Sequence, residues 1–237
     1  MLTDGINWQP ESSGEVRISS PSQLEDFVEQ YGFVPYFKSR IPGFSVEEFC
    51  PVDGWWSGDP QKDPWEWRAQ VAANGRIAYA KLFENKAGFI SREWYPVFAS
   101  YRRDGYDFDS RWDDGLAQRR EKLIMDVLES GESIPSFELK RLAGFGGDGE
   151  KGFESILTRL MMNTYLTIRD FRRRVNARGE EYGWAVSVYS TPEALFGREL
   201  VTSAYQLQRE EAYKKLFGHM REMFPDAAEK DIRRLLR

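Results

Sequence analysis

The sequence predicts an α+β protein, mainly α-helical, with a winged-helix module, small β-hairpins and a helical C-terminus. Two observations support this fold class. Between residues 112 and 164, apolar residues recur at helical spacing in three successive segments. Beyond Tyr165, the sequence is rich in β-branched and aromatic residues in two runs separated by a turn. Three helices followed by a β-hairpin is the order of a winged helix, whose third helix can lie in the major groove of DNA.

The winged-helix module has five expected elements. They are helices at 115–128, 134–142 and 153–162, and strands at 165–172 and 182–189. A turn at 176–179 joins the strands, and a glycine-rich turn at 144–149 separates the last two helices. We expect no strand pairing before Ser155. The glycines do not predict a phosphate-binding loop, because no strand precedes them and no Gly-Lys-Ser or Gly-Lys-Thr ending follows.

The remaining elements follow from capping residues, glycines and prolines. The first is a helix at 20–31 that starts at Ser20 and stops at Gly32, followed by an ordered aromatic-rich loop at 33–63. Next come a helix capped by Asp63 that ends near Gly75, strands at 76–83 and 86–91, and a helix capped by Ser91. A turn-rich link at 102–109 leads to the winged helix, and the C-terminal helices are broken at Gly218 and Pro225. The expected domains are a flexible arm (1–19), an aromatic-rich N-terminal α+β part (20–110), the winged helix (111–190) and C-terminal helices packed on the rest (191–237).

The composition indicates a folded protein of 237 residues. Hydrophobic residues make up 41% and charged residues 30%, so the chain lacks the low-hydrophobicity, high-charge character of disorder. Its apolar runs are far shorter than the ~20 residues of a membrane-spanning helix, and no apolar signal region follows the N-terminus. We therefore expect a cytoplasmic protein with no membrane contact.

The charge distribution favours nucleic acid as a partner despite a net charge of −5. Residues 1–60 contain three basic and ten acidic side chains, so the acidic excess is concentrated there. Five arginines then gather on the expected hairpin, opposed only by Asp170. They are Arg169, Arg172, Arg173, Arg174 and Arg178. Because guanidinium groups match phosphate oxygens, this stripe predicts contact with duplex DNA. A solvated hairpin is the alternative interpretation.

Four residues on the two preceding helices extend the predicted DNA footprint. Lys140 and Arg141 belong to the second helix of the module, and Thr158 and Arg159 to the third. Each is also an ordinary surface residue, so this prediction requires both helices to face the duplex.

The motif Trp65-Glu66-Trp67-Arg68 predicts a catalytic carboxylate in an aromatic pocket. An acid among apolar rings suits proton transfer near neutral pH, so Glu66 is the first candidate for a general acid or base. Asp63 is the second candidate, although its expected use is in capping the helix. Tyr79 and Lys81 are expected to line the same pocket. A core-anchoring helix with an exposed glutamate is the alternative.

The sequence predicts neither a metal site nor a cofactor. His219 is the only histidine and Cys50 the only cysteine, so a zinc site or a Cys–His nucleophile pair has too few partners. No nucleophile-elbow pattern accompanies His219.

From Pro21 to Leu236 the chain resembles the YcaQ/AlkZ type of DNA glycosylase family, specifically the shorter AlkZ-related proteins of bacteria. Three stretches carry this resemblance. They are Asp63-Pro-Trp-Glu-Trp-Arg, Lys86-Ala-Gly-Phe-Ile-Ser and Tyr101-Arg-Arg-Asp-Gly-Tyr-Asp-Phe. The resemblance implies stacked winged-helix units that form a cleft for duplex DNA. It also implies hydrolysis of the N-glycosidic bond of alkylated or crosslinked purines.

The family's catalytic signature is a Gln-x-Gln or Gln-x-Asp pair with an apolar middle residue, and two segments depart from it in different ways. Gln61-Lys62-Asp63 has a lysine in the middle. Gln206-Leu207-Gln208 has the apolar middle residue, but it lies in a predicted helix, where residues two apart point to different faces. The first functional hypothesis is therefore a DNA-associated protein related to alkylpurine glycosylases. The second is a non-catalytic module that binds a protein partner.

Overall fold

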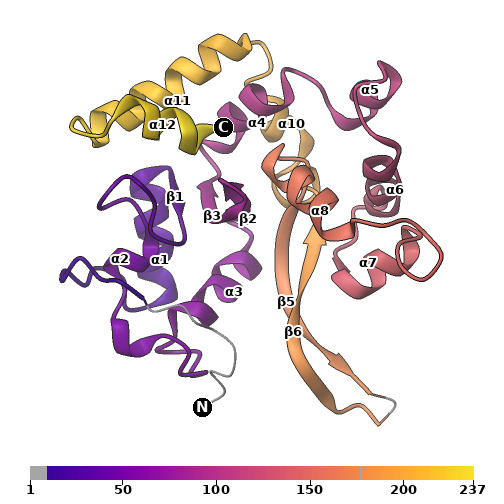
Figure 1. Ribbon diagram of the computed structural model, residues 1–237, viewed down its shortest axis with the longest axis horizontal. Coiled ribbons are helices and arrows are strands. Elements are labelled where there is room, and N and C mark those ends of the chain that lie inside the picture. Colours follow the sequence, from indigo (N-terminus) through magenta and orange to yellow (C-terminus); the bar gives the residue numbers. More distant parts are fainter. Residues whose placement is uncertain (1–9, 177) are drawn as a thin grey trace. The chain divides into compact units, whose positions relative to one another are not determined.

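The computed structural model describes residues 10–176 and 178–237, and these form two compact units (Figure 1). Unit 1 comprises the described residues up to Tyr95 together with Tyr213–Arg237, and unit 2 comprises Pro96–Ala212. The first nine residues of the predicted arm, and Ala177 in the predicted turn, lie outside the described residues. No helix among the described residues is long and apolar enough to cross a membrane.

Unit 1 combines short helices with three antiparallel strands. Its elements are α1 (Pro21–Tyr31), β1 (Phe33–Pro35), α2 (Val46–Phe49), the 3-10 helix η1 (Val52–Gly54), α3 (Pro64–Asn74), β2 (Ile77–Phe83), β3 (Lys86–Ser91), the larger part of α11 (Arg209–Met223) and α12 (Glu229–Leu236). Strand β3 pairs with β1 on one side and β2 on the other. Gly88 of β3 allows a close approach, since a Cβ there would lie 2.4 Å from the Phe83 ring.

Local sequence signals predicted most of unit 1 correctly. The Ser20 side chain caps α1 by accepting the backbone N–H of Gln23, and the Asp63 side chain caps α3 by accepting that of Trp65. The β2–β3 hairpin turns through Glu84 and Asn85, whose φ angles of 49° and 63° are left-handed. These caps and this turn are confirmed.

The prediction of a loop without regular structure at 33–63 was wrong. This stretch contains β1, α2 and η1. Strand β1 has three residues and ends at Pro35 on the sheet edge, where a residue without an N–H is tolerated, so it is too short to show an alternating pattern. Residues 10–19 form neither helix nor strand, and they contribute the fully buried Ile18, whose backbone N–H donates to the carbonyl of Phe49.

Unit 2 contains more helix and three further antiparallel strands. Its elements are α4 (Tyr95–Arg103, apart from its first residue), α5 (Phe108–Asp113), α6 (Arg119–Leu128), β4 (Ile134–Pro135), α7 (Ser136–Leu142), α8 (Phe153–Met162), β5 (Thr167–Val175), β6 (Glu181–Ser190), α9 (Pro192–Phe196), α10 (Arg198–Thr202) and the first residues of α11. Strand β6 pairs with both β5 and β4. The five apolar residues of α8 that recur at helical spacing are all buried, as expected for a helix packed on a core.

The expected order of three helices and a hairpin is present as α6, α7, α8, β5 and β6, but one part of that prediction was wrong. Strand β4 pairs with β6 well before Ser155. It has only two residues, so no periodicity could reveal it. The prediction of a turn-rich link at 102–109 was also wrong, because α4 continues to Arg103 and Asp107 caps α5. Gly218 does not interrupt α11, whereas the break near Pro225 is confirmed.

The β5–β6 hairpin is long, and its far half is exposed. It extends as a twisted ribbon beyond α7 and α8 of the same unit (Figure 1). A bulge interrupts the pairing, because Arg172 pairs with Val186 while Arg174 pairs with Tyr182. Gly183 in the bulge has a φ of 72°, and the side chain of Trp184 beside it is 76% exposed. The hairpin therefore presents an aromatic ring to solvent.

Candidate functional site

The predicted arginine stripe lies on the β5–β6 hairpin. Arg169 is half-buried near the base of β5, whereas the other four arginines are exposed. Arg172 pairs with Asp170 through Nε and Oδ2 at 2.8 Å. The Arg174 guanidinium carbon lies 4.9 Å from the centroid of the Phe137 ring on α7. Apart from Asp170, the opposing acids of the hairpin are Glu180, just before β6, and Glu181, its first residue, so the basic strand of the hairpin is β5.

The four further residues of the predicted DNA footprint differ in exposure and in whether their side chains are already hydrogen-bonded within unit 2. Lys140 and Arg141 are exposed on α7. The Thr158 hydroxyl donates to the carbonyl of Glu154 within α8. Arg159 hydrogen-bonds two side chains at the start of α6. Its Nε donates to Glu121 and its Nη2 donates to the side-chain oxygen of the α6 N-cap residue, each at 2.7 Å. Arg159 therefore joins α8 to α6.

An aromatic cluster in unit 1 brings together three of the five predicted pocket residues. The Arg68 guanidinium carbon lies 3.4 Å from the centroid of the Trp65 ring, and Arg68 hydrogen-bonds the Tyr79 hydroxyl. Burial raises the pKa of Tyr79, and this nearby guanidinium opposes the rise. Lys81 lies two residues further along β2, half-buried, and Trp67 is buried in the core. The indole N–H of Trp67 has no hydrogen-bond acceptor among the described residues.

The two predicted catalytic carboxylates have different surroundings. Glu66 is half-buried in the first turn of α3, and its carboxylate forms neither a hydrogen bond nor an ion pair within the part of the chain that the structure describes. Asp63 is 1% exposed and accepts three backbone N–H groups, from Trp56 at 3.1 Å, Gly58 at 2.9 Å and Trp65 at 2.9 Å. Asp63 therefore fastens the preceding loop to the start of α3.

The segment Gln206-Leu207-Gln208 does not lie in a helix, contrary to expectation. It forms the turn between α10 and α11. Gln208 is the residue before α11, and its backbone N–H donates to the Glu211 carboxylate at 3.0 Å. This capping contact stops the helix short of the Gln-x-Gln segment.

A cavity of about 310 Å³ lies within unit 2, and none of the residues that line it was a predicted site residue. Five carboxylates line it against two cations. The carboxylates are Asp107, Asp109, Asp126, Glu129 and Glu193, and the cations are Lys122 and Arg198. The excess of negative charge favours a cationic or hydrogen-bond-donating ligand over a phosphate. Lys122 forms ion pairs with two of these acids, so its charge is largely compensated.

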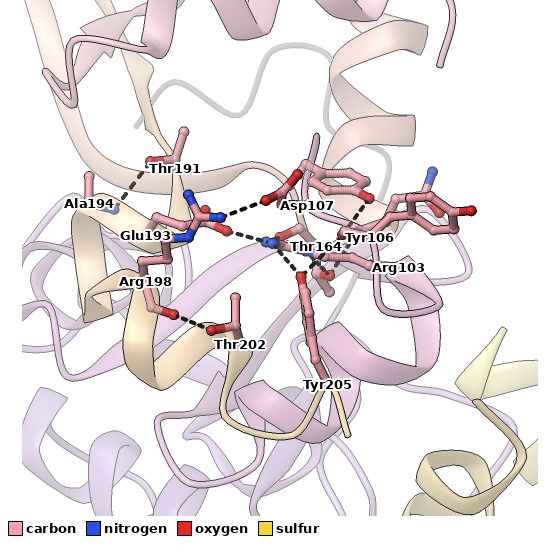
Figure 2. Close-up of polar contacts among 12 residues, drawn as sticks. Arg103, Tyr106, Asp107, Thr164, Thr191, Glu193, Ala194, Arg198, Thr202 and Tyr205 are labelled. Atoms are coloured by element: carbon pink, nitrogen blue, oxygen red, sulfur yellow. Dashed lines mark hydrogen bonds and ion pairs between the residues drawn. The ribbon is translucent and has the colours of Figure 1, made fainter. Parts of the chain in front are cut away.

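Arg103 organises the polar contacts beside this cavity (Figure 2). Its Nη1 donates to Glu193 at 2.5 Å and to the Tyr205 hydroxyl at 3.1 Å. Its Nε and Nη2 donate to the hydroxyl and carbonyl of Thr164 at 3.2 Å and 2.5 Å. The guanidinium also lies over the Tyr165 ring, 4.5 Å from its centroid. One buried arginine thus joins α4 to the α8–β5 connection and α9.

Asp107 and Arg198 form the second ion pair at the cavity, with Nη2 and Oδ2 2.7 Å apart (Figure 2). The pKa of Asp107 is below its usual range, chiefly because its carboxylate accepts hydrogen bonds from the backbone N–H and the side chain of Ser110, and Arg198 lowers it further. The carboxylate is therefore ionised at neutral pH. Sequence reasoning missed this site because Thr191-Pro-Glu193 was interpreted only as a helix start, and Arg103 and Asp107 as parts of a link.

The described residues contain no group of three or more His, Cys, Asp or Glu side chains that could hold a metal ion. Cys50 is buried, and burial raises the pKa of its thiol. The Nε2–H of His219 donates to the carbonyl of Tyr31 at 2.9 Å, and the ring stacks on Trp94, with ring centroids 4.1 Å apart. Both residues are therefore part of the packing of unit 1.

Comparison with known proteins gives one match. No curated protein and no solved structure matches this chain. A family model described as AlkZ related matches residues 18–237. The resemblance inferred from the sequence motifs is thereby confirmed, and this protein belongs to the AlkZ-related family.

Proposed function

We propose that this protein binds duplex DNA through the β5–β6 hairpin, with unit 2 acting as a winged helix. The observation that carries the proposal is the row of exposed arginines on β5, Arg172, Arg173 and Arg174. Such a row can neutralise several phosphates at once and release their counterions. In this arrangement α8 is the helix in the position of the DNA-recognition helix.

Family membership supports a further proposal, that the protein hydrolyses the N-glycosidic bond of alkylated purines. An alkylated purine is already cationic, so it leaves with little acid assistance, and the enzyme's main task is to orient or deprotonate a water. Glu66 is the proposed carboxylate. It lies within an aromatic segment, and none of its oxygens is engaged by another described residue.

The DNA proposal is tested by fluorescence polarisation with a labelled duplex at several salt concentrations. Replacing Arg172, Arg173 and Arg174 together by alanine is expected to weaken binding similarly for all sequences. It is also expected to lower the salt slope by about one unit per lost phosphate contact. The control is alanine at three exposed lysines of unit 1, Lys214, Lys215 and Lys230, which changes the net charge equally.

A second candidate function is binding of a protein partner by the same hairpin. Three exposed apolar side chains favour it, namely Val175, Tyr182 and Trp184. If the arginine variant binds duplex DNA as tightly as the native protein does, the DNA proposal is wrong and this candidate remains.

A further inference from the structure

We infer that unit 1 contains a binding pocket for a nucleotide, in which basic side chains hold the phosphate and an aromatic wall contacts the base. The pocket has a volume of about 350 Å³ and lies between α12 and the ends of strands β1, β2 and β3. All of its lining residues belong to unit 1, whereas the hairpin and the acidic cavity belong to unit 2. The inference does not depend on the proposed function.

The charges around this pocket select an anion. Four cations line it, Lys38, Arg40, Lys86 and Arg234, against the single carboxylate of Glu84. This balance is the reverse of that in the unit 2 cavity. A phosphate group is the common biological anion that such a set of donors recognises.

Two of the four cations are available to a ligand. Lys38 pairs with Glu11, and Arg234 pairs with Glu84, so these two charges are partly compensated. Arg40 and Lys86 are exposed, and neither forms an ion pair within residues 10–176 and 178–237. The phosphate is therefore placed between Arg40 and Lys86.

The remaining walls are apolar and suit a planar ring. Phe37, Phe83, Leu235 and Pro35 contribute them. Phe83 and Leu235 are buried, whereas Phe37 is half-exposed and offers part of its ring to the pocket. The volume is several times that of a phosphate ion and lies at the lower end of the range for small-molecule sites. An aromatic face beside a phosphate site is the combination that binds a nucleotide by stacking and charge together.

The phosphate can come from a free nucleotide or from a nucleotide within a single strand, and calorimetric titration distinguishes them. The titrants are deoxyadenosine monophosphate, deoxyadenosine and a short single-stranded oligonucleotide. We expect the monophosphate to bind and the nucleoside to bind at least tenfold more weakly. Tighter binding of the oligonucleotide identifies the strand as the source, and equal or weaker binding identifies the free nucleotide.

Variants connect the binding to this pocket. Arg40→Glu with Lys86→Glu is expected to weaken monophosphate binding at least tenfold. The matched control, Lys214→Glu with Lys215→Glu, changes two exposed lysines of unit 1 outside the pocket by the same charge and is expected to change nothing. Phe37→Ala is expected to weaken binding of the monophosphate but not of inorganic phosphate.

The hairpin variant lacking Arg172, Arg173 and Arg174 is expected to bind the monophosphate normally, so failure of the DNA proposal leaves this result unaffected. The inference is overturned if millimolar monophosphate and oligonucleotide both fail to bind. It is also overturned if the pocket variant, folded as judged by circular dichroism, binds as well as the native chain.

Discussion

Arg103 and Glu193, 90 residues apart in the chain, form an ion pair in which the arginine side chain is 1% exposed and the glutamate side chain 30% exposed. The arginine also satisfies Thr164 and Tyr205. A buried guanidinium is costly to desolvate, so it is stable only when its donors are matched in this way. The pair therefore holds the wall of the acidic cavity in one arrangement.

Arg103→Met is expected to lower the free energy of unfolding by about 3–5 kcal/mol, because it leaves Glu193 and the Thr164 carbonyl without their donor. Urea unfolding at neutral pH measures the change. The control is Arg198→Ala, which breaks the more exposed pair with Asp107 and is expected to cost no more than about 1 kcal/mol. An unchanged midpoint for Arg103→Met would show that the buried pair adds no net stability.

Asp63→Ala is expected to destabilise the protein by about 2–4 kcal/mol, since the carboxylate is both the cap of α3 and the acceptor for Trp56 and Gly58. Ser20→Ala removes a more exposed cap and is expected to cost about 1 kcal/mol or less. Thermal unfolding compares the two. Should Asp63→Asn instead remove base release without altering the unfolding temperature, Asp63 would be catalytic rather than structural.

Glu66→Gln is expected to abolish release of alkylated purines while leaving duplex DNA affinity nearly unchanged, because it removes a water-activating carboxylate that forms no hydrogen bond or ion pair with another described residue. Chromatography of free bases from methylated DNA measures the release. Glu129→Gln, in the unit 2 cavity, is the comparison variant. Loss of release in Glu129→Gln alone would transfer the chemistry to that cavity, and no release by the native protein would refute the glycosylase proposal.

The free energy of unfolding is expected to fall as the pH rises above about 10. Burial raises the pKa of Tyr36, Tyr79, Tyr165 and Tyr205 in the folded protein. Unfolded tyrosine loses its proton near pH 10, so above that pH the folded state binds more protons than the unfolded state. The stability present below pH 10 is therefore lost progressively, by up to about 1.4 kcal/mol per pH unit for each tyrosine.

Urea midpoints measured between neutral pH and about pH 11 check this slope. Tyr79→Phe removes one of the contributing groups and is expected to make the decline shallower. A midpoint that does not change above pH 10 would show that these hydroxyls ionise as readily in the folded protein as in the unfolded chain.

The sequence predicted those features that depend on a few neighbouring residues. Ser20 and Asp63 were recognisable as caps because a cap is a local hydrogen bond next to a helical pattern. The arginines of β5 were visible because they lie within ten residues of one another. The family resemblance likewise depended on three short stretches.

The features that sequence did not predict depend on distant partners or on very short elements. Nothing near Arg103 indicates that Glu193 is its partner. Strand β4 has two residues, too few for a period. Trp184 belongs to an alternating run of the kind that faces a core, yet it is exposed, because it lies in the far half of the hairpin, where residues 181–185 are all exposed. The basic pocket of unit 1 collects residues from three parts of the chain.

The division of the chain has a consequence for the order in which the protein can fold during synthesis. Unit 2 is one continuous stretch, Pro96–Ala212, whereas unit 1 needs α12 to complete its core, with Ile232, Leu235 and Leu236 buried. At roughly 5–20 residues per second, the ribosome makes α12 several seconds or more after β3. Unit 2 can therefore finish folding first, while part of the apolar surface of unit 1 is still uncovered. A chaperone that binds the nascent chain is expected to recognise that surface. A truncation after Met223 is expected to destabilise unit 1 rather than unit 2.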